Sequence, residues 1–231
     1  MRKKTNIVFL PCRKGSQRVP NKNTRIFADI DGGLLRIKLL QLLNCIQIDK
    51  IYLSSDDEDV IDIGKSMNDK RIVIDKRPSY LCQSSTSTDD LIKYVPQLIK
   101  EDCTIIWTHV TSPFLDAKRY DDMITLYYSH IDKYDSLMSV NELKTFIWDK
   151  INSVNYDRSI EKWPRTQTLE SLYEVNSGVF IADKSIYEIL NDRIGHKPFL
   201  YPLSKIESFD IDWQDDFDLA EIMYRSLNNK K

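Results

Sequence analysis

The chain has 231 residues, of which 42% are hydrophobic and 29% charged, so it has enough apolar material for a buried core and is not a disordered chain. The 33 Lys and Arg residues against 35 Asp and Glu give a formal net charge of −2, which argues against a nucleic-acid binder that neutralises phosphates in bulk. An α/β chain of this length commonly folds as one unit, and we expect residues 1–231 to form a single domain.

Short apolar runs alternate along the chain with longer segments of helical periodicity, which is typical of βαβ units around a mostly parallel sheet. We expect strands at residues 6–10, 50–54, 71–74, 104–107 and 179–181. We expect helices at residues 34–43, 88–99 and 184–190, in the segment that runs from the acidic turn 56–59 through Met67, and after Asp215. This order predicts an α/β fold that binds its ligand at loops following the carboxyl ends of the strands.

The alternation stops between about residues 140 and 175, where aromatic side chains stand among polar residues and no long helix is expected. We interpret this segment as an excursion from the sheet. Because subunit contacts are enriched in Tyr, Trp and Arg, the excursion is a candidate dimerisation element, and a surface β-flap is the alternative.

Several common sites are excluded by the distribution of glycine and cysteine. The six glycines are too scattered for a G-x-G-x-x-G dinucleotide loop, and Asp59 stands where a P-loop ending in Gly64-Lys65-Ser66 needs its first glycine. The four cysteines form no C-x-x-C pair, so neither a zinc site nor a disulfide framework is indicated, and scattered thiols fit a reducing compartment. No stretch approaches the ~18 apolar residues of a membrane span, and the run at residues 7–10 is too short for a signal sequence. We therefore expect a soluble, cytoplasmic protein.

The loop after the first expected strand, residues 11–23, has the composition of a phosphate-binding loop. It contains four cations, one glycine and several amide and hydroxyl donors. Backbone N–H groups of a glycine-containing turn can approach phosphate oxygens while Arg and Lys neutralise their charge. A solvated basic loop is the alternative interpretation.

Two aspartates near the end of the chain, Asp210 and Asp212, are candidate metal ligands. Placed two apart on an expected strand, their side chains would share one face and converge on one divalent cation. Carboxylate oxygens are the ligands that Mg²⁺ prefers. The alternative is that both are acids that cap the helix beginning near Asp215.

Six segments of the chain resemble, in the same order, the motifs of the acylneuraminate cytidylyltransferases, the family of the CMP-sialic acid synthetases. These segments are residues 10–23, 53–58, 77–88 (Arg77-Pro78, Leu81 and Ser85 to Thr88), 111–113 (Thr-Ser-Pro), 176–178 (Asn-Ser-Gly) and 209–212 (Phe-Asp-Ile-Asp). The resemblance covers nearly the whole chain. It implies the three-layer, mostly parallel nucleotidyltransferase fold of the nucleotide-diphospho-sugar transferase type.

In this family a sugar hydroxyl attacks the α-phosphate of CTP and pyrophosphate leaves. The resemblance implies nucleotide contacts from Leu10, Arg13, Ser16, Lys22, Arg77 and Thr88. It implies catalytic roles for Arg13, Lys22 and Asp212, and it places Mg²⁺ at Asp210 and Asp212. Positioning and cancellation of phosphate charge are what phosphoryl transfer requires, and a metal that lowers the pKa of the sugar hydroxyl makes a dedicated protein base unnecessary.

The resemblance also implies a homodimer with shared active sites and a sugar-acid acceptor. It suggests acceptor contacts from His109, Thr111, Ser112, Arg165, Gln167 and Asn176. Arg165 and Gln167 match an element that reaches the sugar acid of the neighbouring subunit, and an Arg fork fits a carboxylate. His109 stands where the family usually has glutamine, so it is either an altered sugar contact or a structural residue. Asn176 is either a sugar contact or a turn residue that tolerates positive φ.

Three functional hypotheses follow. The first is a Mg²⁺-dependent cytidylyltransferase that makes a CMP-activated sugar acid of sialic, legionaminic or pseudaminic type for surface glycans. The second is CMP transfer to a different hydroxyl or phosphonate acceptor, indicated by His109 and by Asp31-Gly32-Gly33-Leu34, which replaces the family's Gly-Lys-Pro-Leu. The third is a non-catalytic nucleotide-binding or assembly protein, which the joint presence of Arg13, Lys22, Arg77, Asp210 and Asp212 argues against.

Overall fold

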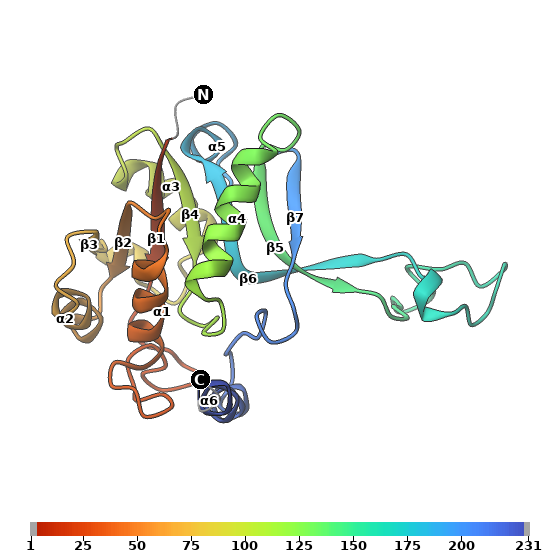
Figure 1. Cartoon of the computed structure of the whole chain (residues 1–231), viewed down its shortest axis with the longest axis horizontal. Coiled ribbons are helices and arrows are strands. Elements are labelled where there is room, and N and C mark those ends of the chain that lie inside the picture. The colour runs from red at the N-terminus through yellow and green to blue at the C-terminus, as the bar shows by residue number, and fades with distance from the viewer. Residues whose placement is uncertain (1–3, 229–231) are drawn as a thin grey trace.

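One seven-stranded sheet forms the centre of the molecule, as the computed structural model, which describes residues 4–228, shows (Figure 1). The strands are β1 (Thr5–Pro11), β2 (Lys50–Ser55), β3 (Ile72–Lys76), β4 (Cys103–Thr108), β5 (Ser136–Leu143), β6 (Leu172–Asp183) and β7 (Pro198–Pro202). They lie in the order β3-β2-β1-β4-β6-β5-β7, and β6 runs antiparallel to both of its neighbours. β2 and β4 flank β1 on opposite sides, so the connection after β1 leads to one side of it and the connection after β3 returns to the other. Open α/β sheets form a ligand crevice at such a point.

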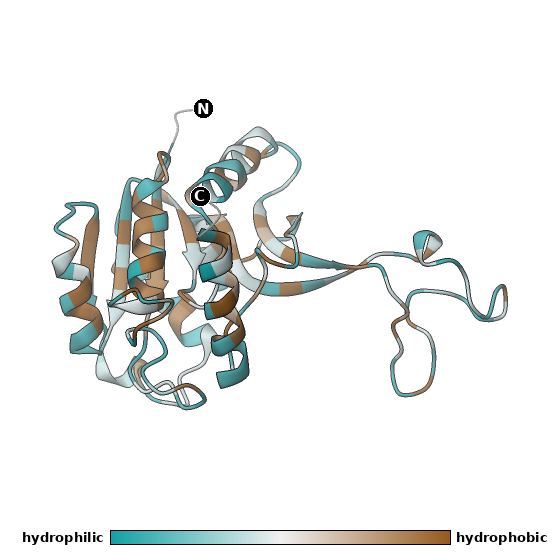
Figure 2. Ribbon diagram, turned by 60° about the horizontal axis from the view of Figure 1, so that its bottom comes forward, coloured by the Kyte–Doolittle hydropathy of each residue, from teal (hydrophilic) through white to brown (hydrophobic). Residues whose placement is uncertain are grey.

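Helices cover both faces of this sheet. They are α1 (Gly33–Asn44), α2 (Glu58–Ser66), α3 (Thr88–Leu98), α4 (Ala117–Ser129), α5 (Lys184–Leu190) and α6 (Gln214–Asn228), with short 3-10 turns at Ser79–Leu81 and Thr166–Thr168. Buried side chains of α1, α2, α4 and α6 join one hydrophobic cluster, and those of α3 and α5 join a second. Figure 2 shows the hydrophobic strands between these layers. The three-layer arrangement and the mostly parallel sheet are those predicted.

Local sequence explains where four of the helices begin. Asp57, Ser87, Asp116 and Asp183 stand one residue before α2, α3, α4 and α5, and each side chain accepts a hydrogen bond from a backbone N–H of the first turn. Ser87 and Asp90 form a complete capping box. Such caps satisfy donors that have no partner within the helix. The helix predicted from the acidic turn 56–59 is therefore confirmed.

The other predicted helices and all five predicted strands are also present, with small differences at their ends, whereas α4, β5 and β7 were not predicted.

One expectation about the two aspartates was wrong. Asp210 and Asp212 do not lie on a strand: residues 209–212 form an irregular segment between β7 and α6. A second correction concerns Asn176, which lies within β6 beside a register shift of the β5–β6 pair rather than in a turn, and its φ is not positive.

An arm formed by residues 144–171 extends from the body of the molecule, where β5 and β6 continue past the sheet (Figure 1). It is mostly irregular, as expected of the excursion. Large hydrophobic side chains on the arm are exposed to solvent: Trp148, Ile151, Val154, Ile160 and Trp163. Five large apolar side chains exposed on one short segment make the arm a candidate interaction surface.

The C-terminal helix packs against the segment that follows the first loop. The Arg25 guanidinium lies 4.2 Å from the centre of the Phe217 ring, and the Ala28 N–H donates to Glu221 Oε1 at 2.6 Å. Gly33 is required where this segment crosses the start of α1, because a Cβ there would lie 2.0 Å from the Arg25 carbonyl oxygen. This docking brings residues 210–212 beside the end of the first loop. In the part of the chain from residue 4 to residue 228, no helix has the length and apolar character needed to span a bilayer.

Candidate active site

The loop of residues 11–23 leaves the carboxyl end of β1 and is fixed to the end of β2. The Cys12 N–H donates to the Ser54 carbonyl at 2.9 Å, and the Lys14 N–H donates to Asp56 Oδ1 at 2.8 Å. Gly15 adopts a positive φ of 76°, which favours glycine, and space lies open around it. The loop encloses a hollow of about 210 Å³ that is lined by Arg13, Ser16, Gln17, Arg18, Val19 and Lys22.

Three cations, Arg13, Arg18 and Lys22, line this hollow. Such a set of positive charges suits the binding of phosphate groups. Arg13 donates to the Gln83 carbonyl at 2.9 Å and thereby joins the loop to the segment that precedes α3. Arg18 pairs with Asp212 at 3.1 Å and lies over the Trp213 ring at 5.0 Å. Within residues 4–228, Arg13 forms no ion pair, so its charge is free to meet an anion.

Lys22 connects the loop to the segment of the two aspartates. Its Nζ donates to the Ile211 carbonyl at 2.6 Å and lies 3.8 Å from Asp212 Oδ1. Partial burial lowers the pKa of Lys22, while Asp212 and Asp210 act in the opposite direction. A partly desolvated ammonium beside this hollow could stabilise negative charge on a group bound there.

The Asp210 carboxyl is a candidate ligand for a divalent metal, because one of its oxygens lacks a partner among the described residues. Its Oδ1 is buried without a hydrogen-bond partner among the described residues, and burial is the main reason why the pKa of this carboxyl is raised. Asp212 is half exposed on the other side of Ile211. Mg²⁺ is commonly held by one or two carboxylates, water and substrate phosphates, and this donor set fits that chemistry. Across residues 4–228 no group of three or more His, Cys, Asp or Glu residues could hold a metal without the substrate.

Arg77 lies in the wall behind the loop and is largely occupied by structural contacts. It is buried, and its Nε and Nη2 donate to the hydroxyl and the carbonyl of Ser54 at 3.0 and 2.7 Å. The Ser54 hydroxyl in turn donates to Asp75, which also accepts from Tyr94. Arg77 therefore ties the ends of β2 and β3 together behind the candidate nucleotide site.

His109 follows the carboxyl end of β4 and is neutral around pH 7. Its Nε2 accepts a hydrogen bond from the Trp107 indole at 3.0 Å, which places the proton on Nδ1. Burial lowers the pKa of His109 to about 3, and the nearby cations Arg193, Lys22 and Lys38 lower it further. The ring can donate a hydrogen bond from Nδ1 but is not a base that becomes protonated near pH 7.

Thr111 and Asn176, two further candidate acceptor contacts, are both engaged by neighbouring groups of the protein. The Thr111 carbonyl accepts from the Ile211 N–H at 3.0 Å, and the Thr111 side chain acts to lower the pKa of the Asp210 carboxyl. The Asn176 side chain is engaged within the protein, because its Oδ1 accepts from Ser139 and from the Gly178 N–H. Asn176 thus orders the backbone at the shift between β5 and β6.

The structure brings only some of the predicted residues together. Those gathered around the hollow or the aspartate segment are Arg13, Ser16, Lys22, Thr111, Asp210 and Asp212. Leu10 is buried in the core, and Thr88 is exposed at the start of α3. Arg165 and Gln167 lie on the arm, which points away from the body of the chain (Figure 1). Sequence reasoning missed Arg18, although it stands in the basic loop, and Lys38, which is concealed in an apolar helix.

Comparisons with known proteins match one family across nearly the whole chain. The family model described as cytidylyltransferase matches residues 7–228. An N-acylneuraminate cytidylyltransferase of Escherichia coli is 27% identical over 97% of this chain and 53% of its own length. A pseudaminic acid cytidylyltransferase of Campylobacter jejuni is 26% identical over 95% of this chain and 96% of its own length. The chain therefore spans about half the length of the N-acylneuraminate relatives it matches and nearly all of the pseudaminic acid relative.

Solved structures show the same fold. A CMP:2-keto-3-deoxy-manno-octonic acid synthetase complexed with CTP superposes with a TM-score of 0.68 at 11% identity and covers 96% of this chain and 99% of its own. A 4-diphosphocytidyl-2C-methyl-D-erythritol synthase from Anaerococcus prevotii superposes with a TM-score of 0.67 at 15% identity and covers 96% of both chains.

Proposed function

The chain belongs to the cytidylyltransferase family, and we propose that it transfers CMP from CTP to a hydroxyl of a sugar acid and releases pyrophosphate. The relatives named for N-acylneuraminate and for pseudaminic acid favour an acceptor of the sialic or pseudaminic type. A role in building surface glycans would follow from such a product. We further propose that residues 1–231 act as a single domain whose arm makes the subunit contact.

The observation that carries the proposal is the meeting of the cationic loop with the aspartate segment. Lys22 lies between the hollow of residues 11–23 and Asp212, while Arg13 and Arg18 line the same hollow. Nucleotidyl transfer needs cations around the leaving pyrophosphate and carboxylates that would hold a divalent metal near the reacting phosphate. This juxtaposition supplies both in one place.

Each part of the site has a defined task in the proposed reaction. The loop binds the β- and γ-phosphates through Arg13, Ser16 and Lys22, which draws negative charge away from the α-phosphorus. The α-phosphate then faces the 210–212 segment, and the acceptor hydroxyl attacks it in line with the departing pyrophosphate. Lys22 holds its proton and stabilises the pyrophosphate oxygen as the bond to the α-phosphorus breaks.

Asp210 and Asp212 are the residues we propose to hold Mg²⁺. When bound, the ion polarises the phosphate and lowers the pKa of the acceptor hydroxyl. The protein's own contribution is to keep Asp210 Oδ1 unpartnered and Asp212 accessible.

We propose that the acceptor site is completed by a second copy of the chain. Arg165 and Gln167 belong to the arm of residues 144–171, which extends away from the body of its own chain (Figure 1). In a homodimer the arm would bring them to the site of the partner subunit. A guanidinium is suited to bind the carboxylate of a sugar acid. His109, which offers a neutral N–H donor, would meet the acceptor from the body of the chain.

The experiment is pyrophosphate release with CTP and Mg²⁺ against a panel of sialic, legionaminic and pseudaminic acids and a phosphonate. Reactions with UTP, with ATP and without acceptor are the controls. Release that requires CTP and a sugar acid supports the proposal. If every sugar acid is inert while the phosphonate reacts, the acceptor assignment is wrong. If no acceptor reacts although CTP raises the melting temperature, the chain binds the nucleotide without the proposed transfer.

A further inference from the structure

Lys38, in the middle of α1, is a fully buried lysine without an ion-pair partner among residues 4–228. Its Nζ donates to the Ser112 carbonyl at 2.8 Å and to the Tyr120 hydroxyl at 2.9 Å. Burial lowers the pKa of Lys38 to about 7. Burying an amine costs free energy, whereas burying an apolar side chain does not. A lysine at this position is therefore explained by its two hydrogen bonds.

The hydrogen bonds that begin at Lys38 run in one direction. The Thr108 hydroxyl donates to the Gly178 carbonyl at 2.7 Å, and this contact uses its single proton. The 2.8 Å contact between Thr108 and Tyr120 is therefore donated by Tyr120. Tyr120 must then accept from Lys38, so the chain of donors runs from Lys38 through Tyr120 and Thr108 to the backbone of β6.

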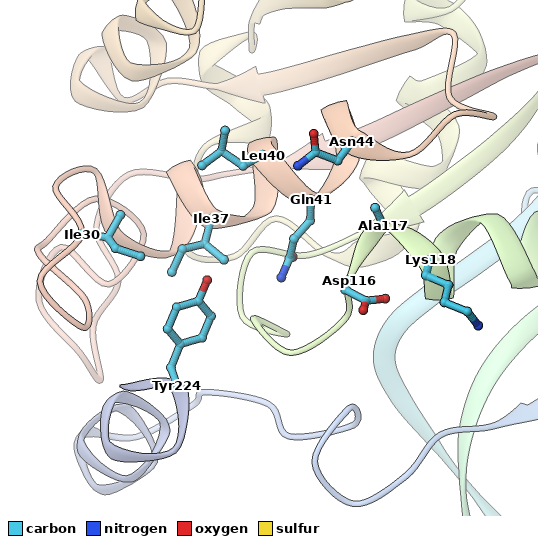
Figure 3. Close-up of a pocket in the computed structure, with 9 residues that line it drawn as sticks. All are labelled: Ile30, Ile37, Leu40, Gln41, Asn44, Asp116, Ala117, Lys118 and Tyr224. Carbon is cyan, nitrogen blue, oxygen red and sulfur yellow. The ribbon is translucent and has the colours of Figure 1, made fainter. Parts of the chain in front are cut away.

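The other branch runs from Lys38 to the aspartate segment. Ser112 adjoins Thr111, whose carbonyl accepts from the Ile211 N–H at 3.0 Å. Gln41, one turn further along α1, donates to the Pro113 carbonyl at 2.6 Å and supports the same loop. Figure 3 shows Gln41 reaching from α1 toward the loop that leads to Asp116.

The two branches end at different parts of the proposed active site. The Ser112 branch ends beside Asp210, the proposed metal ligand with the unpartnered oxygen. The Tyr120 branch ends at Gly178, whose N–H is bound by Asn176 on the proposed acceptor side. Lys38 is thus the common origin of contacts that hold both sides and touches neither substrate site itself.

We propose that Lys38 is a positioning residue that fixes the metal side of the site through Ser112 and the acceptor side through Tyr120 and Thr108. The inference rests on the proposed function for its kinetic consequences. The proposal also says that Lys38 holds the 111–113 and 210–212 segments in place. That part does not depend on which reaction takes place.

The kinetic test compares three variants. Lys38→Met removes the origin of both branches, Tyr120→Phe removes only the acceptor branch, and Tyr127→Phe is a matched control on the same helix, outside both branches. We expect Lys38→Met to lower kcat about tenfold or more and to raise the Mg²⁺ concentration for half-maximal activity, because misplacement of reacting groups is costly. Tyr120→Phe should raise KM for the acceptor several-fold with KM for CTP unchanged. Tyr127→Phe should leave all three quantities unchanged.

A merely structural role for Lys38 predicts a different result. Lys38→Met would then lower the melting temperature and leave kcat, the acceptor KM and the Mg²⁺ dependence as in the wild type, which would overturn the proposal. If Lys38→Met does not fold, Tyr120→Phe still decides the acceptor branch: an unchanged acceptor KM would refute it.

Hydrogen exchange provides a readout that does not require the proposed reaction. Lys38→Met should speed amide exchange in a peptide covering residues 208–213, because the Ile211 N–H loses a fixed acceptor, whereas Tyr120→Phe and Tyr127→Phe should not. Unchanged exchange in Lys38→Met would overturn the proposal whatever the enzyme does. If the wild type transfers CMP to no acceptor while exchange responds as expected, the proposed function fails and the positioning of the aspartate segment stands.

Discussion

Lys22 and Asp212, from opposite ends of the chain, face each other with Lys22 Nζ 3.8 Å from Asp212 Oδ1, and the same Nζ donates to the Ile211 carbonyl at 2.6 Å. The relationship joins the loop that follows β1 to the segment that precedes α6. Arg18 reaches the same carboxylate at 3.1 Å. We expect the phosphates of a bound nucleotide to compete with Asp212 for both cations, which leaves that carboxylate accessible to a divalent ion.

Replacing Lys22 by methionine should reduce kcat/KM for CTP about 10²- to 10³-fold, because the leaving pyrophosphate loses a partly desolvated cation. Steady-state kinetics with varied CTP measure this effect. Lys14→Met is the matched control, since Lys14 is exposed in the same loop and does not line the hollow. Equal losses in both variants would mean that only the overall charge of the loop matters.

Asp210→Asn should stabilise the protein and abolish metal-dependent turnover. Burial raises the pKa of Asp210, so its ionised form costs stability in the folded state. A neutral amide removes that cost, so we expect the variant to have the higher Tm at pH 7.5. Because the Asp210 carboxyl loses its charge at low pH, the stability gained by the substitution depends on pH. The gain is fully present above the raised pKa of Asp210, shrinks as the pH falls through it, and is absent below the ordinary carboxyl pKa. Thermal unfolding of both proteins at several pH values checks this, and a lower Tm for the variant at pH 7.5 would contradict it.

His109 should make the protein less stable as the medium becomes acidic. Its pKa is about 3 in the folded protein against an ordinary value of 6.5, so the unfolded chain binds a proton more readily between these values. The free energy of unfolding should therefore fall below pH 6.5, by at most about 1.4 kcal/mol per pH unit from this residue. His109→Gln should flatten the slope in urea titrations between pH 4.5 and 6.5. Parallel slopes for the two proteins would refute the assignment.

The arm should carry the subunit contact. The double variant Ile160→Asp and Trp163→Asp places charges on two exposed apolar side chains of the arm, and we expect a monomer in analytical ultracentrifugation at micromolar concentration. Ile46→Asp is the control, since Ile46 is 89% exposed on the body of the chain. A wild-type protein that is monomeric and fully active would exclude the shared site.

Mixing two inactive variants tests whether the site is shared. Lys22→Met damages the nucleotide site of its own chain, and Arg165→Ala damages the proposed contribution to the partner's site. In a mixed dimer one of the two sites is intact, so we expect combined samples, after subunit exchange, to recover about a quarter of the wild-type activity. Mixtures that stay inactive would show that Arg165 serves its own chain or has no role in the site.

Much of the fold was predictable because its signals are local. Apolar runs marked β1, β2 and β4, and the acidic turn 56–59, which includes the cap Asp57, marked where α2 begins. The spacing of Tyr120, Met123, Ile124 and Tyr127 is typical of a helix and could have identified α4. β7 carries a proline at each end and was harder to predict, because proline is uncommon in strands.

The site was predictable in its residue types and less so in its geometry. The composition of residues 11–23 indicated a phosphate loop. The approach of Asp212 to Lys22, however, depends on α6 packing against the segment around Arg25, which no local pattern encodes. The burial of Lys38 could not be predicted from the sequence, because a lysine within an apolar helix is usually assigned to the solvent side.

Transfer of CMP to a sugar acid is tested most directly by identifying, with mass spectrometry, the product formed from CTP, Mg²⁺ and a sialic or pseudaminic acid. We expect a CMP ester of the sugar acid and one equivalent of pyrophosphate from the wild type, and neither product with Asp212→Ala. Intact CTP and unmodified acid after incubation with the wild-type protein, or an ester formed equally well by Asp212→Ala, would contradict it.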